Sequence, residues 1–107
     1  MAPPESVPRI RDAAELATEA ARLGTSGRVL LLQVGSESCV KCPAFGEAVA
    51  SLANEYEFGW YYCDAHDDTD IPEAHCITKL PAVVIVRNGM SEIAEQIDET
   101  TLRETVR

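Results

Sequence analysis

Apolar residues recur at two different spacings along this 107-residue chain, and each spacing predicts one type of element. Between residues 13 and 24, apolar side chains repeat at every third or fourth position, which is typical of a helix with one buried face. Asp12 and Glu15 stand at the spacing of a capping box, and Gly24 is suited to end the helix. We therefore expect a first helix over residues 13–24.

A second helical pattern begins at residue 45 and predicts a helix that ends near Tyr56. Pro43 has no backbone N–H to donate and fits only in or near a first helical turn, so it fixes the start of this helix. Between the two helices, residues 28–35 are almost continuously apolar, which is typical of a strand buried on both faces.

Shorter patterns account for the rest of the chain. The aromatic-rich residues 58–63 and the β-branched residues 82–86 fit strands. Asn88-Gly89 is a strong hairpin signal and predicts a partner strand over residues 90–97. The remaining segments predict a polar loop, a helical turn and a capped C-terminal helix, over residues 64–70, 72–76 and 98–104.

The order of the predicted elements is β-α-β-α-β-α-β-β-α, beginning with a short strand over residues 7–10 that Pro8 confines to a sheet edge or a strand start. A long buried strand flanked by helices implies an α/β sandwich around a mixed central sheet. Residues 1–7 are rich in proline, so we expect a flexible lead-in followed by one domain over residues 8–107. The 46% hydrophobic content suits a folded domain of this length.

Composition narrows the function classes. The formal net charge of −9 at pH 7 argues against binding to nucleic acid or to anionic membranes. The longest aliphatic run, residues 82–86, is too short to span a membrane. The first residues lack the layout of a signal peptide, so we expect a soluble cytoplasmic protein. In that setting, four cysteines indicate catalysis or metal binding before a disulfide framework.

The sequence Cys39-Val40-Lys41-Cys42 stands between the apolar strand and the second helix. Two cysteines separated by two residues lie within one helical turn, close enough to bond to each other. Unpaired N–H groups at a helix N-terminus favour a thiolate, which makes Cys39 a candidate nucleophile and Cys42 its resolving partner. The charge of Lys41 is expected to lower the pKa of the thiols, and that of Glu37 to oppose it.

The cysteines outside the motif, the histidines and the clustered aspartates are interpreted as structural or surface residues. Cys63 and Cys76 are interpreted as small core hydrophobes, since free cysteine is among the most buried residue types. A zinc site made of the four cysteines is the alternative interpretation, although Cys63 and Cys76 lack the spacing of zinc ligands. His66, His75 and the aspartates within residues 64–70 are interpreted as solvated surface groups.

The chain resembles the thioredoxin family over residues 7–106, and four features carry the resemblance. The CxxC pair ends the second predicted strand and Asp64 follows the third. Leu80-Pro81 precedes the strand of residues 82–86, and Asn88-Gly89 forms the last hairpin. The resemblance implies a thioredoxin-like three-layer α/β/α sandwich. It also implies a cis peptide bond before Pro81, placed against the cysteine pair, and a substrate-binding role for Leu80 and Pro81.

Three places differ from the family pattern. The family usually has Trp before the first cysteine and Gly-Pro between the cysteines, where this chain has Ser38 and Val40-Lys41. Gln33 stands where the family usually has a buried carboxylate that helps to deprotonate the resolving thiol. An amide can hold a hydrogen bond or a water but cannot accept a proton at neutral pH. Cys42-Pro43 is closer to some glutaredoxin-like and archaeal small redox proteins. We therefore expect Ser38, Lys41 and Gln33 to modulate the site.

Two hypotheses on function follow from the resemblance. The first is a thiol–disulfide oxidoreductase that exchanges electrons between the Cys39–Cys42 pair and protein disulfides, without a bound cofactor. A thioredoxin-reductase or glutathione-type donor would recharge it, and a monomer is expected. The second is a thioredoxin-like interaction module that binds partners in the groove beside the cysteines with weak or no redox turnover.

Overall fold

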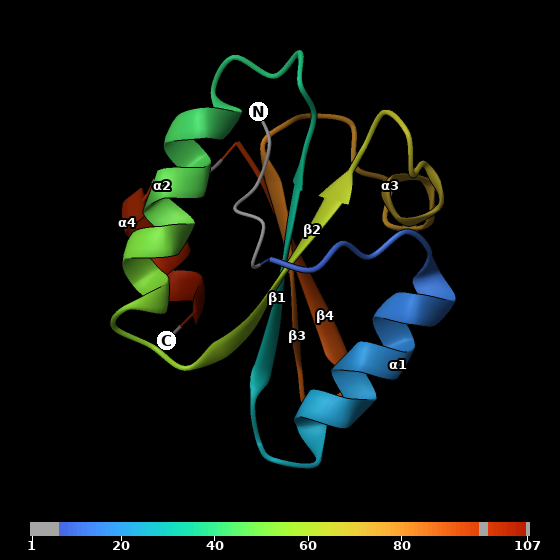
Figure 1. Ribbon diagram of the computed structural model, residues 1–107, viewed down its shortest axis with the longest axis vertical. Coiled ribbons are helices and arrows are strands. Elements are labelled where there is room, and N and C mark those ends of the chain that lie inside the picture. The colour runs from blue at the N-terminus through green and yellow to red at the C-terminus, as the bar shows by residue number, and fades with distance from the viewer. Residues whose placement is uncertain (1–6, 97–98, 107) are drawn as a thin grey trace.

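A four-stranded sheet forms the centre of the protein in a computed structural model that describes residues 7–96 and 99–106 (Figure 1). The spatial order of the strands is β2-β1-β3-β4. β1 and β2 run parallel, whereas β3 is antiparallel to both β1 and β4, so the sheet is mixed as predicted. The strands are β1 (Val29–Gly35), β2 (Phe58–Asp64), β3 (Ala82–Arg87) and β4 (Met90–Glu95).

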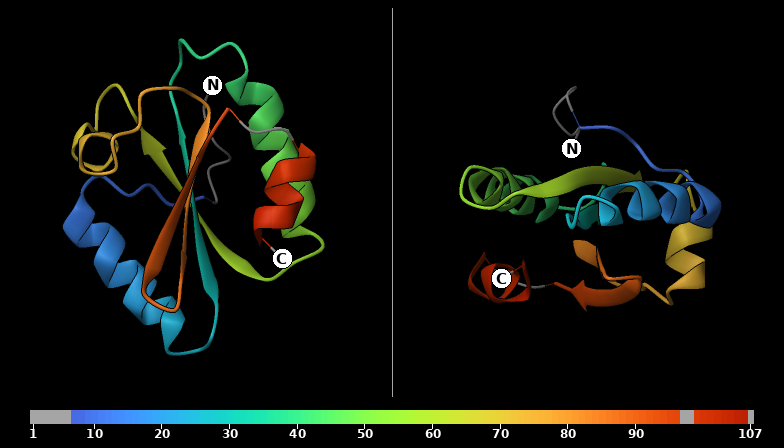
Figure 2. Two further views of the ribbon diagram at one scale, coloured as in Figure 1. Left: turned by 180° about the vertical axis from the view of Figure 1, so that it is seen from behind. Right: turned by 90° about the horizontal axis from the view of Figure 1, so that it is seen from below.

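Helices cover both faces of the sheet. α1 and α3 pack on one face, and α2 and α4 pack on the other (Figures 1 and 2). This arrangement confirms the predicted three-layer α/β/α sandwich. None of the described helices has the length and apolar character needed to cross a membrane. The helices are α1 (Ala13–Gly24), α2 (Cys42–Ala53), α3 (Asp70–Ala74) and α4 (Glu99–Val106).

Strand β1 contributes to a separate hydrophobic core on each face of the sheet. Leu30, Leu32 and Val34 pack into the core beneath α1 and α3, whereas Leu31 packs into the core beneath α2 and α4. All four side chains are fully buried. Successive side chains of a strand point to opposite faces, so Gln33 shares the α2 face with Leu31. The nearly continuous apolar run of this segment is explained by burial on both sides.

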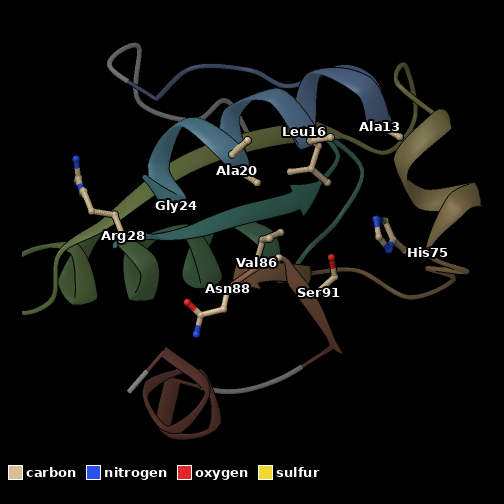
Figure 3. Close-up of a pocket in the computed structure, with 12 residues that line it drawn as sticks. Ala13, Leu16, Ala20, Gly24, Arg28, His75, Val86, Asn88 and Ser91 are labelled. Atoms are coloured by element: carbon tan, nitrogen blue, oxygen red, sulfur yellow. The ribbon is translucent and has the colours of Figure 1, made fainter. Parts of the chain in front are cut away.

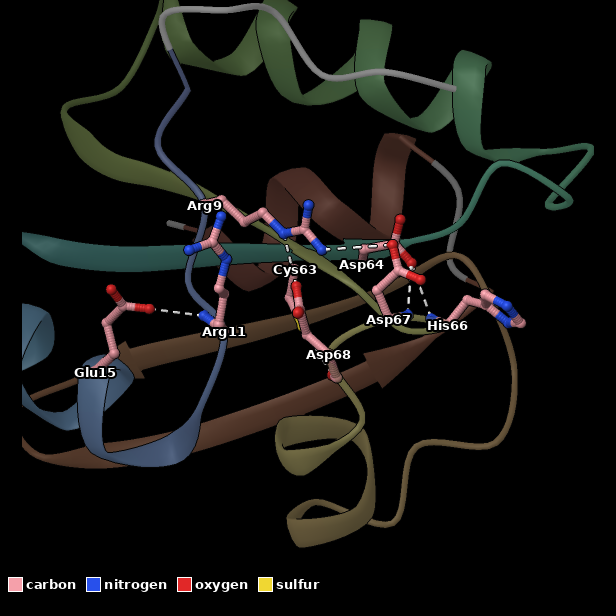
Figure 4. A network of polar contacts seen from close by, with 8 residues as sticks. All are labelled: Arg9, Arg11, Glu15, Cys63, Asp64, His66, Asp67 and Asp68. Carbon is pink, nitrogen blue, oxygen red and sulfur yellow. Dashed lines mark hydrogen bonds and ion pairs between the residues drawn. The ribbon is translucent and has the colours of Figure 1, made fainter.

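The predicted first strand is reduced to a single bridge between Arg9 and Tyr62 of β2. The Pro8 carbonyl accepts from the Tyr62 N–H at 2.9 Å, and the Ile10 N–H donates to the Tyr62 carbonyl at 2.8 Å. Pro8 has no N–H to extend this ladder. The segment is also tied to the loop after β2, because Arg9 donates to Asp68 at 2.7 Å (Figure 4). Of the predicted lead-in, residues 1–6 lie outside the described residues and Val7 is buried.

Element ends account for the other differences from the sequence prediction. α2 ends at Ala53 rather than near Tyr56, because the N–H groups of Glu55 and Tyr56 both turn back to the Leu52 carbonyl at 2.9 Å. The short turn predicted over residues 72–76 is α3, which begins and ends two residues earlier. Of the predicted β4 and C-terminal helix, residues 97 and 98 lie outside the described residues.

The N-terminus of α1 gives a test of the local sequence signal. The Asp12 carboxylate accepts from the Glu15 N–H at 2.8 Å, so Asp12→Ala leaves that donor without its partner. We expect the free energy of unfolding to fall by about 1 kcal/mol, measured by urea denaturation. Asp12→Asn keeps an acceptor oxygen at the cap and should stay close to the wild type. Equal stability of Asp12→Ala and the wild type would contradict the capping role.

Candidate functional site

The two cysteines of the CxxC motif lie where the chain passes from β1 into α2. Cys39 and Cys42 form a disulfide, with their Cα atoms 5.4 Å apart. The connecting turn is held by the Cys39 N–H, which donates to the Ser36 carbonyl at 3.2 Å, and by the Cys42 N–H, which donates to the Cys39 carbonyl at 3.3 Å. The structure therefore joins the two sulfurs that the sequence singles out.

The two cysteines differ in their access to solvent. Cys42, the first residue of α2, is only 2% exposed, whereas Cys39 is half-buried. Between them, Val40 is 93% exposed and Lys41 is also exposed. Lys41 is the N-cap of α2 and makes no side-chain capping bond, and the first turn of the helix carries no acidic residue. The positive end of the helix dipole thus lies next to the pair and favours negative charge there.

Gly35, the last residue of β1, provides the space for the inner sulfur. A Cβ atom built on Gly35 would lie 3.0 Å from the Cys42 Sγ, closer than side chains normally approach. The same Cβ would lie 3.6 Å from the hydroxyl of Tyr62 on β2. The missing side chain therefore lets α2 bring Cys42 against the end of the strand.

Gln33 is buried on the same face of β1 as Gly35, with only 1% of its surface exposed. Its Oε1 accepts from the indole Nε1 of Trp60 at 3.1 Å. Its Nε2 has no hydrogen-bond partner and is the one such buried side-chain atom among the described residues. Gln33 is thus a neutral amide with an unused donor, and it offers no base.

Burial also changes the titration of groups on β2. It raises the pKa of Tyr62 to about 12, and the negative charge of Asp64 acts in the same direction. It likewise raises the pKa of Cys63 to about 12. The Cys63 thiol is fully buried on the α1 face and donates to the Asp68 carbonyl at 3.7 Å (Figure 4). Both groups therefore stay protonated at neutral pH.

Leu80 and Pro81 lie beside the end of β1. The peptide bond between them is cis. Ala82 pairs with Val34, so the antiparallel register places Pro81 alongside Gly35. Pro81 is buried and Leu80 is half-buried, and the Pro81 carbonyl accepts from the Gln96 N–H at 2.7 Å.

No protein-family model matches the sequence, and no curated protein sequence matches it significantly. Solved structures do match over nearly the whole chain. A thioredoxin from Fasciola hepatica is 22% identical with a TM-score of 0.80, over 94% of this chain and 96% of that one. Oxidised mitochondrial thioredoxin 3 from Saccharomyces cerevisiae is 16% identical with a TM-score of 0.83, over 94% and 93%. The chain has the thioredoxin fold.

A third similar structure comes from work on thiol resolution in yeast mitochondrial 1-Cys peroxiredoxin by the glutathione and thioredoxin systems. It is 16% identical with a TM-score of 0.82, over 94% of this chain and 93% of that one. At these identities the likeness establishes the fold alone.

Two recesses lie on different sides of this thioredoxin fold. A polar recess of about 300 Å³ adjoins the cysteine motif, because Ser36, Glu37 and Ser38 line it. Its other lining residues lie at the end of β2 and in the loop after it: Asp64, His66 and Asp67. Ser38 is exposed, and its hydroxyl lies 3.1 Å from that of Ser36. A more apolar recess of about 560 Å³ lies between α1 and the β3–β4 hairpin (Figure 3). It is on the opposite face from Cys42 and contains no cysteine.

The cysteines outside the motif have different environments. Cys63 is a core residue as predicted, but the same prediction for Cys76 is wrong, because Cys76 is exposed. It follows the C-cap of α3 with a left-handed φ of 55°, where the chain leaves the helix at the surface. No group of three or more metal-ligating side chains is gathered within residues 7–96 and 99–106, so the four-cysteine zinc site does not form there. His66 is exposed as predicted, and His75 is half-buried.

Sequence reasoning missed three residues of the site: Gly35 and Tyr62, which lie beside the inner cysteine, and Trp60, which donates to Gln33. Gly35 could have been noticed as a residue without a side chain at the end of the apolar run, four positions before Cys39. Trp60 and Tyr62 enter the sequence prediction only as part of the aromatic-rich strand of residues 58–63. Their contacts depend on the register of β2 against β1, which pairs Gln33 with Tyr62.

The contrast between the free thiols gives a second prediction. In the oxidised protein at pH 8, iodoacetamide should modify Cys76 and leave Cys63 unmodified, because burial excludes the reagent and keeps that thiol protonated. Mass spectrometry of the intact protein would count the adducts. Cys76→Ser should abolish labelling of the folded protein, and unfolding should restore it at Cys63. Comparable labelling rates for both thiols would contradict the buried position of Cys63.

Proposed function

We propose that the protein is a thiol–disulfide oxidoreductase that exchanges the Cys39–Cys42 pair with disulfides of other proteins. The observation that carries the proposal is the bonded pair at the start of α2, with a half-buried outer sulfur and a buried inner sulfur. An exchanger needs one sulfur that a partner can reach and a second that is close but protected. The thioredoxin fold of the chain supports this interpretation.

The exchange proceeds in two displacements. In the reduced protein, the Cys39 thiolate attacks a substrate disulfide, forms a mixed disulfide and releases one substrate thiolate. The Cys42 thiolate then attacks the Cys39 sulfur, which forms the Cys39–Cys42 disulfide and releases the second substrate thiolate. Two electrons pass from the dithiol to the substrate, and its two sulfurs take up protons from water. The substrate is reduced and the protein is oxidised.

The residues around the pair receive their roles from position and charge. We assign Leu80 and Pro81 to substrate binding, because their register places them beside the end of β1. Val40 offers an exposed apolar contact between the two cysteines. The charge of Lys41 favours the thiolate of Cys39, and Ser38 leaves the outer sulfur without a bulky neighbour.

The partners follow from the reaction. Protein disulfides are the proposed substrates, and a thioredoxin-reductase or glutathione-type system is the proposed electron donor. The dithiol itself carries the two electrons, so the reaction needs no bound cofactor. We propose that the protein acts in the cytoplasm and as a monomer. A binding module with little turnover is the second candidate, favoured by the neutral amide of Gln33 where a base would speed resolution.

Reduction of insulin by dithiothreitol tests the activity. The wild-type protein should accelerate insulin precipitation, and Cys39→Ser should abolish the acceleration because it removes the attacking sulfur. Cys76→Ser is the matched control, since it removes an exposed thiol outside the motif and should retain full activity. An inactive wild-type protein would favour the binding module. Activity that survives Cys39→Ser would assign the chemistry to another thiol.

Gln33 predicts a slow second displacement, so mixed disulfides should persist. Ellman's reagent shows this in a Cys76→Ser background, where attack by Cys39 releases the first chromophore and resolution by Cys42 releases the second. Gln33→Glu places a carboxylate on the same face as Cys42 and should speed the second phase about tenfold or more, since a general base contributes at least that much. The first phase should change little. A second phase as fast as the first in the wild-type protein would contradict the prediction.

The same variant has a stability signature that serves as its control. Burial raises the pKa of a carboxyl group, so the folded variant binds its proton more tightly than the unfolded chain does. Its free energy of unfolding, relative to the wild type, should therefore be highest below the usual pKa of glutamate and should decrease as the pH rises from that value through the raised pKa of the folded variant. Urea denaturation between pH 4 and pH 8 measures this.

A further inference from the structure

Two side chains from different elements border the space left by Gly35. The Cys42 sulfur comes from the start of α2, and the Tyr62 hydroxyl comes from β2. A Cβ atom built on Gly35 would lie 3.0 Å from the sulfur and 3.6 Å from the hydroxyl oxygen. Both atoms thus lie within contact distance of one point, on the inner side of the cysteine pair.

The hydroxyl of Tyr62 is uncommitted, in contrast with that of its neighbour. Tyr61 points to the α1 face, where its hydroxyl donates to Glu19 at 2.8 Å and accepts from Arg22 at 2.8 Å. Across residues 7–96 and 99–106, the Tyr62 hydroxyl makes no hydrogen bond, although the residue is only 5% exposed. The hydroxyl therefore keeps a donor that is committed to no other group of the described residues and can serve an acceptor nearby.

The surroundings keep Tyr62 a donor rather than a base. Burial is the main reason that its pKa lies at about 12, with Asp64, Cys63 and Glu37 acting in the same direction and Arg9 opposing them. The phenol is therefore protonated throughout the neutral range. Gln33, which pairs with Tyr62 on the adjacent strand, is also neutral, and the carboxylate of Asp64 at the end of β2 accepts from the backbone N–H groups of His66 and Asp67.

We propose that Tyr62 is a positioning residue for Cys42, whose thiolate accepts a hydrogen bond from the Tyr62 hydroxyl once the Cys39–Cys42 bond opens. The role in resolution rests on the proposed exchange activity, and the contact itself does not. A hydrogen bond to the charged form of a group stabilises that form. The Cys42 thiol then loses its proton to water, and the phenol holds the resulting thiolate ready to attack the mixed disulfide. By stabilising the thiolate, this hydrogen bond favours ionisation of Cys42 without a general base, a role that the amide of Gln33 cannot perform.

The test measures the pKa of Cys42 directly, in a Cys39→Ser, Cys76→Ser background with ¹³C-labelled cysteine. The only other thiol, Cys63, lies on the opposite face with a pKa of about 12, so its NMR signal is separable. Tyr62→Phe should raise the pKa of Cys42 by about one pH unit, as expected for loss of a hydrogen bond to a charged group. The carboxylates of Glu37 and Asp64 and the cations of Arg9 and Lys41 remain in place in every variant.

Tyr61→Phe is the matched control, because it removes a hydroxyl one position away on the opposite face and should leave the pKa of Cys42 unchanged. An unchanged pKa in folded Tyr62→Phe overturns the proposal, as does an equal shift in both variants. Should Tyr62→Phe not fold, 3-fluorotyrosine at position 62, a more acidic donor, should lower the pKa of Cys42, and no change would overturn the contact. An inactive wild-type protein that still shows the Tyr62→Phe shift overturns the exchange activity and leaves the contact standing.

Discussion

The register of β1 is the constraint on which the site depends, because this strand carries both hydrophobic cores and leads into the cysteine pair. Its side chains alternate between the faces, so Leu30, Leu32 and Val34 lie under α1. Leu31, Gln33 and Gly35 lie on the α2 face. A slip of one residue would exchange the two sets and would present a bulky apolar side chain to Cys42. The pairing of β1 with a neighbour on each side, β2 and β3, fixes this register.

The two sulfurs of the motif are held in different environments by the elements around them. The outer cysteine lies at the surface beside a polar recess that includes Glu37. The inner cysteine and the neutral phenol of Tyr62 border the space left by Gly35, and the neutral amide of Gln33 is buried on the same face of β1. In the proposed exchange, this difference gives the order of the two displacements, because solvent access favours Cys39 as the first sulfur to attack and Cys42 as the second.

Local patterns in the sequence were sufficient for much of this fold. α1 was predictable because its apolar spacing, Asp12 and Gly24 all specify the same segment, and the hairpin was predictable from Asn88-Gly89. The contacts of Tyr62 were not, because they depend on which residues of β1 and β2 lie opposite each other. Cys76 was misjudged because burial was inferred from residue type, whereas the chain leaves α3 there in a left-handed turn. Tertiary pairing, rather than propensity, positions the groups around the inner sulfur.

The bridge from the N-terminal segment to β2 also covers part of one edge of the sheet. In the described part of the chain, β2 and β4 are the outermost strands, and residues 8–10 lie along the free side of β2. β4 carries the exposed apolar side chains of Met90 and Ile93, with the acidic Glu92 between them. An outer strand with unpaired backbone groups can recruit a strand from another molecule, and charge on it discourages this. The N-terminal segment thus protects β2 from strand addition, which leaves β4 as the edge at which a second copy could add a strand. Repulsion between like carboxylates opposes such self-association at β4.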